Sequence, residues 1–187
     1  MMLSRILLAL VLALGATQAQ ADRKTRDNYS FSVGGGLWNV TYAPESGSDF
    51  SMLGAMARGA YELSRSLAVE AHFGLTDSET QNVFSGTVPV SLRVNALGGV
   101  FAKLSWVYGG NRDGWARIYG LLGYSMVDVE AKAQGQTAND SESGPSFGIG
   151  LDLFGSDRTA VVLEWVRYIE QNDFDIDAGG LSIIRRF

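Results

Sequence analysis

The stretch "SLAVEAHFGL", residues 66–75, decides the fold because its side chains alternate strictly in character. One parity carries apolar side chains: Leu67, Val69, Ala71, Phe73 and Leu75. The other parity carries small or polar ones: Ala68, Glu70, His72 and Gly74. Since successive side chains of a strand point to opposite faces, the stretch predicts a β-strand with one apolar face and one small or polar face.

The same alternation recurs along the chain and predicts eight strands, with no helical pattern between them. The other seven are expected at residues 28–42, 51–62, 88–107, 115–129, 145–154, 160–169 and about 176–187. The connections alternate in length. Short turns are expected at 63–66, 109–114 and 155–158, and longer polar loops at 43–50, 77–87, 130–144 and 170–175. Short turns at one end and long loops at the other are typical of a transmembrane barrel.

The first residues have the pattern of a secretory signal peptide. Arg5 precedes the apolar run "ILLALVLAL" (6–14), and Ala19-Gln20-Ala21 gives the small-x-small cleavage pattern. The apolar run is too short to span a membrane as a helix. We therefore expect residues 1–21 to be a signal peptide cleaved after Ala21, and residues 22–187 to form one barrel domain.

Composition excludes several classes of function. The chain has no cysteine and one histidine, which leaves no thiol nucleophile and disfavours a zinc site. Its net charge of −5 disfavours nucleic acid as a partner, because nucleic-acid binding needs clustered Lys and Arg. We expect no cofactor and no resident metal.

A soluble eight-stranded barrel of the lipocalin type is the main structural alternative. Such a barrel needs a solvent face rich in charged residues, but here the non-apolar face is mostly Gly, Ala and Ser. Aromatic residues also lie towards the strand ends, as in the girdles at membrane interfaces: Tyr29, Tyr42, Tyr61, Trp106, Tyr108, Trp115 and Tyr124. The sequence therefore favours an all-β, eight-stranded antiparallel up-and-down transmembrane β-barrel in the outer membrane.

Ionisable side chains on the small face define a candidate lumen site. These salt-bridge candidates are Arg58, Glu70, His72, Arg93, Lys103, Arg117 and Glu164. They could line a gated pore or form a salt-bridged plug, and the plug is favoured because eight strands leave little room for water. His72 beside Glu70 could also act as a base, but its inward parity disfavours an enzyme.

The long loops are acidic and are the candidate interaction surface. They carry Glu45, Asp49, Asp77, Glu79, Glu130, Asp140, Glu142, Glu170, Asp173 and Asp175 against Lys132 alone. These carboxylates could bridge divalent cations to lipopolysaccharide phosphates, form an adhesive surface for a ligand, or simply keep the loops solvated.

Three segments carry a family resemblance: "ARIYGLLGYSMVDVEA" (116–131), "FGIGLDLFGSDRTAVVLEWVRYIE" (147–170) and the final "LSIIRRF". They resemble the small eight-stranded outer-membrane β-barrel family of Gram-negative bacteria, which includes the membrane domain of outer-membrane protein A and the opacity-type surface proteins. The resemblance implies that the assembly machinery of the outer membrane reads Phe187, and that Glu70 and Glu164 look similar to lumenal glutamates of outer-membrane protein A.

The resemblance also orders the functional alternatives. It implies a structural or surface-interaction barrel first, a narrow porin-like channel for small solutes second, and a lipid-modifying enzyme third. The lipid A deacylases of similar size use a lipid-facing His and Ser, a pattern from which the inward His72 departs. The palmitoyl-transferring barrels have a preceding amphipathic helix, for which "DRKTRDN" (22–28) is too short. Arg185 shares the lipid-facing parity of Phe187 and is expected near the headgroups.

Overall fold

The computed structural model describes residues 30–45, 49–83, 88–111, 114–171 and 174–187. The expected signal peptide and Tyr29 lie outside these residues. The strands are β1 (Phe31–Pro44), β2 (Phe50–Glu62), β3 (Leu67–Thr76), β4 (Ser78–Val83), β5 (Val88–Asn111), β6 (Gly114–Ala133), β7 (Gln136–Phe154), β8 (Thr159–Glu170) and β9 (Phe174–Arg186). No helix in this part of the chain is long and apolar enough to cross a membrane.

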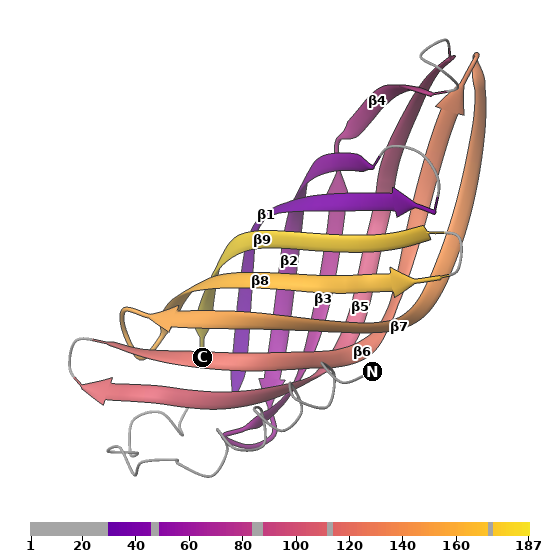
Figure 1. Ribbon diagram of the computed structural model, residues 1–187. Coiled ribbons are helices and arrows are strands. Elements are labelled where there is room, and N and C mark those ends of the chain that lie inside the picture. Colours follow the sequence, from indigo (N-terminus) through magenta and orange to yellow (C-terminus); the bar gives the residue numbers. More distant parts are fainter. Residues whose placement is uncertain (1–29, 46–48, 84–87, 112–113, 172–173) are drawn as a thin grey trace.

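The strands form one antiparallel sheet that closes on itself (Figure 1). The first and last strands pair along their length, from Ser32 opposite Arg186 to Pro44 opposite Phe174. β3 and β4 both pair with β5, at Leu97–Leu104 and at Val88–Arg93 respectively, so together they occupy one position in the ring. The ring therefore has eight strand positions in up-and-down order, as the alternation predicts.

Two of the expected long loops are extensions of the sheet. The segment 130–144 continues β6 and β7 in unbroken pairing up to Ala133 opposite Gln136, and β4 occupies much of the segment 77–87. Gln134 and Gly135 both have positive φ, the geometry of a tight hairpin turn that matches strand twist. The loop ends of β4, β5, β6 and β7 consequently project beyond the rest of the barrel (Figure 1).

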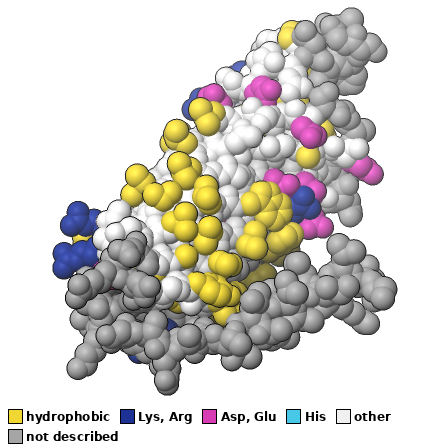
Figure 2. All heavy atoms as spheres, turned by 60° about the vertical axis from the view of Figure 1, so that its left-hand side comes forward, with side chains coloured by type: hydrophobic (Ala, Val, Ile, Leu, Met, Phe, Trp, Pro, Cys, Tyr) yellow, Lys and Arg dark blue, Asp and Glu magenta, His cyan; other side chains and the backbone are white. Residues whose placement is uncertain are grey.

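The outer face of the ring carries an apolar belt. Leucine, isoleucine and valine side chains are exposed at its middle, including Leu37, Val100, Leu122, Ile149, Leu181 and Ile183. Figure 2 shows such side chains gathered across the middle of one face, with a group of Lys and Arg beyond one end and with Asp and Glu, interspersed with further Lys and Arg, towards the other. Tyr61, Tyr108 and Tyr124 are exposed as a girdle requires, whereas Trp115 is buried and stacks on Phe154 inside the ring.

The inner face has two sections. The apolar section lies at the loop end and includes Trp38, Met52, Val94, Phe101 and Tyr168. The charged section lies below it. A shift in strand parity helps to build the apolar section. The pairing of β5 with β6 shifts register between Val94 and Ala96, so Leu92 and Val94 point inward with Leu97 and Phe101. The expectation for Arg93 was therefore wrong: its side chain is exposed on the outer surface, because the bulge reverses the alternation that the sequence implied.

Candidate functional site

The charged section of the lumen is one continuous chain of alternating acids and bases. Its order is Glu164, Arg58, Glu70, Lys103, Asp152, Arg117, Glu62 and Arg186. These residues come from β2, β3, β5, β6, β7, β8 and β9, so the chain ties together seven of the eight strand positions. With four carboxylates and four cations, its formal charge is zero when His72 is neutral.

Short contacts link each member of this lumen network to the next. Arg58 contacts Glu70 and lies 2.8 Å from Glu164, while Lys103 Nζ lies 3.0 Å from Glu70 and 3.3 Å from Asp152.

The other half of the network continues towards the turn end of the barrel. Arg117 donates to Asp152 at 2.7 Å and to Glu62 at 2.8 Å, and Arg186 donates to Glu62 at 2.9 Å. Both halves satisfy the rule that buried charges are paired, since an isolated one would carry a large desolvation cost.

Two phenols and the imidazole join the network to the apolar section. His72 Nε2 lies 2.8 Å from Glu70, and its Nδ1 lies 2.8 Å from the Tyr168 hydroxyl. Tyr119 donates to Glu164 at 2.6 Å, and the Lys103 ammonium sits 3.6 Å from the centre of the Tyr119 ring. Both ring nitrogens of His72 therefore have partners inside the lumen.

Gly150 makes room for the Tyr119 phenol. A Cβ atom at position 150 would overlap the end of the Tyr119 ring, which is almost fully buried. Close packing of the lumen face thus requires a glycine at position 150.

The apolar section lies directly on the loop side of His72. The Trp38 ring packs edge-on against His72, with ring centres 5.6 Å apart, and lies tilted against Tyr168, with ring centres 5.2 Å apart. The ring centre of Phe101 lies 4.8 Å from that of His72. Val94, Met52, Ile169 and Ile176 have no accessible surface. The apolar section therefore consists of buried aromatic and aliphatic side chains that pack directly against His72.

The structure brings six of the seven predicted lumen residues together and leaves out Arg93. Arg58, Glu70, Lys103, Arg117 and Glu164 lie in the ion-paired chain, and His72 lies beside it. Three members were missed: Glu62, Asp152 and Arg186. Their inward parity could have revealed them, since Asp152 shares the parity of Gly150 and Arg186 alternates with Arg185.

The lumen network does not fit a metal ion. Glu70, His72 and Glu164 could each offer a ligand atom within 4.8 Å of the others. However, the Arg58 guanidinium already bridges both carboxylates, so a bound cation would have to sit against that charge. The arrangement is chemically suited to holding strands together across the lumen.

A closed antiparallel ring with an apolar outer belt and a polar, ion-paired interior is the architecture of an outer-membrane β-barrel. The family model for the outer membrane protein beta-barrel domain matches residues 6–187. The chain belongs to this family and resides in the bacterial outer membrane. No curated protein matches the chain in sequence.

Solved structures share the fold at low sequence identity. Ail, the attachment invasion locus protein of Yersinia pestis, is 17% identical with a TM-score of 0.63, over 85% of this chain and 99% of Ail. Neisserial surface protein A is 10% identical with a TM-score of 0.61, over 84% and 97% respectively. The N-terminal β-barrel domain of Pseudomonas aeruginosa OprF is 12% identical with a TM-score of 0.53, over 83% and 97%.

Proposed function

We propose that the protein is a structural and surface-interaction barrel whose lumen is closed to solutes. The observation that carries this proposal is the apolar section stacked on the lumen network. A water-filled path would have to pass Trp38, Phe101 and Tyr168, which are packed against one another and buried. Eight strands enclose an interior that side chains can fill completely, which supports a plug.

The proposal assigns surface interaction to the loop end of the barrel. The β6–β7 extension carries Glu130, Asp140 and Glu142, and its Lys132 is bonded to Glu130 at 2.6 Å. That hydrogen bond lowers the pKa of Glu130, so the carboxylate stays ionised in mildly acidic surroundings. Ail, by contrast, has been solved in complex with the heparin analogue sucrose octasulfate, which is a polyanion. The acidic loop end here supports a cationic ligand instead.

A narrow channel for small solutes is the second candidate. One observation favours it: Asp152 Oδ1 and Glu164 Oε1 are buried and have no hydrogen-bond partner among the described residues. Buried carboxylate oxygens are usually satisfied, so this part of the lumen is suited to ordered water. The apolar section, however, would separate such water from the loop end. The proposal gives His72 no catalytic role, because its ring is enclosed in the lumen.

Solute flux into proteoliposomes tests the closed lumen. Liposomes that contain the refolded protein should take up arabinose no faster than protein-free liposomes. Liposomes that contain a large-pore porin serve as the positive control, because a variant of the apolar section alone would leave the lumen network in place. Wild-type uptake that rises in proportion to the amount of protein would overturn the closed lumen and favour the channel.

The surface role is tested by shortening the β6–β7 extension. A variant that joins Asp128 to Ser141 through a two-residue Asn-Gly turn keeps the hairpin geometry and removes its tip. Cells that carry this variant should lose adhesion to surfaces coated with a cationic polymer such as polylysine, while their resistance to detergent is unchanged. Unchanged adhesion would remove the surface role from this extension.

A further inference from the structure

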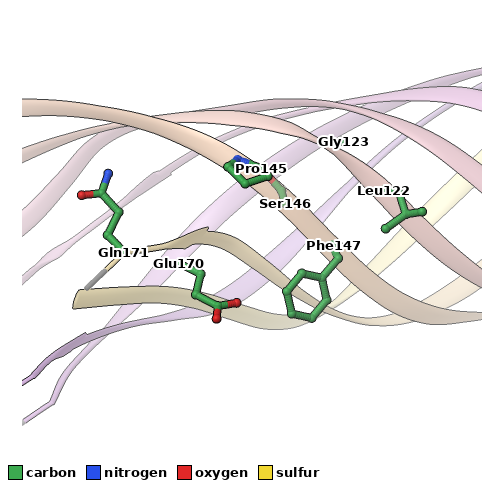
Figure 3. A pocket seen from close by; sticks show the side chains of 7 residues that line it. All are labelled: Leu122, Gly123, Pro145, Ser146, Phe147, Glu170 and Gln171. Carbon is green, nitrogen blue, oxygen red and sulfur yellow. The ribbon is translucent and has the colours of Figure 1, made fainter. Parts of the chain in front are cut away.

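Strands β7 and β8 separate near the loop end and leave a wedge between them. Their pairing stops at Phe147 opposite Arg167. Beyond that point β7 stays paired with β6 as far as Gln136, whereas β8 ends at Glu170. The wedge is a cavity of about 430 Å³ between the two strands, and Figure 3 shows Glu170 and Gln171 on one side of it and Pro145, Ser146 and Phe147 on the other.

The floor of the wedge is apolar and continuous with the lipid-facing belt. Leu122 of β6 is 63% exposed and Phe147 of β7 is 40% exposed, both on the outer face. Trp165 packs edge-on against Phe147 with ring centres 5.9 Å apart. An alkyl chain from the surrounding membrane could lie on this floor without leaving apolar surroundings, and its burial there would be favourable.

The mouth of the wedge is polar and carries an excess of negative charge. Gln171 reaches across it and donates to Glu142 of β7 at 2.9 Å. The nearest guanidinium, that of Arg167, bonds Asp177 twice, at 2.8 and 2.9 Å. It lies 3.9 Å from Glu170, whose side chain is exposed. The Glu142 and Glu170 carboxylates are therefore not fully neutralised by this one cation.

We propose that the wedge binds a cationic amphiphile, with the alkyl chain on Leu122 and Phe147 and the ammonium group at Glu170, which lines the cavity, while Glu142 adds its negative charge from beyond Gln171. The volume falls in the range of about 300–1,000 Å³ that is typical of small-molecule sites. A phosphate or sulfate headgroup would meet the same two carboxylates and be repelled. The wedge site requires only that the outer face of the barrel meets lipid, and it does not require a closed lumen. The proposal of a wedge site and the proposal of a closed lumen can therefore fail independently.

Paramagnetic relaxation in nanodiscs tests the site. The probe is a spin-labelled dodecylammonium, and dodecyl sulfate with the same label is the anionic comparison. The amides of Gly123 and Ser146 should relax in a saturable way with the cation and much less with the anion. The variant Glu142→Gln/Glu170→Gln should weaken the cation by about tenfold, the loss expected for two partly exposed ion pairs.

Two further variants separate the wedge from general membrane partitioning. Glu45→Gln removes an exposed carboxylate elsewhere on the loop end and should leave binding unchanged. Leu122→Trp fills the floor of the wedge and should abolish the saturable relaxation of the Gly123 and Ser146 amides. A shift in electrophoretic mobility on heating shows that this variant is folded before heating. Equal relaxation by cation and anion, or unchanged cation binding in the double Gln variant, would overturn the proposal.

Discussion

Replacing Arg58 with Met should destabilise the barrel more than any other single change in the lumen network. Arg58 lies between Glu70 and Glu164 and also contacts Tyr119 and Ser182. Methionine keeps the apolar volume of the side chain but removes the charge. Breaking a buried ion pair from one side costs about 3–5 kcal/mol, because the remaining charge stays buried. Glu70 remains paired with Lys103 in this variant, so the loss of unfolding free energy arises mainly at Glu164. We expect a loss of about 3 kcal/mol.

Reversible urea unfolding in lipid vesicles measures this loss of unfolding free energy. Arg93→Met is the matched control, since Arg93 is exposed on the same barrel and its removal should change stability by less than about 0.5 kcal/mol. The double variant Arg58→Met/Glu164→Gln should recover part of the loss, because it removes the unpaired carboxylate. A loss below about 1 kcal/mol for Arg58→Met, or no recovery in the double variant, would refute this reasoning.

Three further changes test the packing and the membrane placement. Gly150→Ala should cost about 1–3 kcal/mol of unfolding free energy in the same urea assay, because its Cβ would overlap Tyr119; Gly144→Ala, in open space on the same strand, should be neutral. Leu181→Arg should cost about 2–4 kcal/mol if Leu181 faces the bilayer midplane, and an unchanged urea midpoint would contradict that depth. Arg185→Tyr should assemble at least as well as wild type in refolding yield, and a severe assembly defect would count against the placement of the last strand.

The number of strands and their faces were predictable because a buried or lipid-facing side enforces strict alternation. In β3 every odd residue from Leu67 to Leu75 is exposed and every even one from Ala68 to Thr76 is buried, as the sequence implied. In β5 both parities are apolar near Leu92 and Leu97, so the register shift beside Val94 has no signature in the alternation. Only the pairing with β6 reveals the bulge that turns Arg93 outward.

The β6–β7 extension could not be predicted from hydrophobic pattern because it has no buried face. From Gln136 to Glu142 its side chains are exposed or half-exposed, and backbone pairing to β6 is what makes this segment a strand. Side-chain alternation reports burial, so a polar hairpin above the membrane looks like a loop. Gln134 and Gly135 are the one local signal, as a Gly at the second turn position favours a two-residue hairpin turn.

Strand parity and residue type together identified most of the lumen network but not its extent. Glu62 and Arg186 lie at strand ends, where parity is least certain, and they meet only because β9 returns beside β1 and β1 beside β2. The apolar section was hidden for a different reason. In β1 and β8 both parities carry apolar residues near the loop end: Val40 is buried with Trp38, and Val166 and Ile169 are buried with Tyr168, so residue type does not separate the lumen face from the lipid face there.

Single-channel recording of the refolded protein in planar bilayers tests the central claim most directly. At neutral pH and high salt, wild type should show no steady openings, because the apolar section and the lumen network together close the interior. A large-pore porin recorded under the same conditions should give openings, which shows that the recording can detect them. Steady, resolved openings of the wild-type protein would contradict the closed lumen.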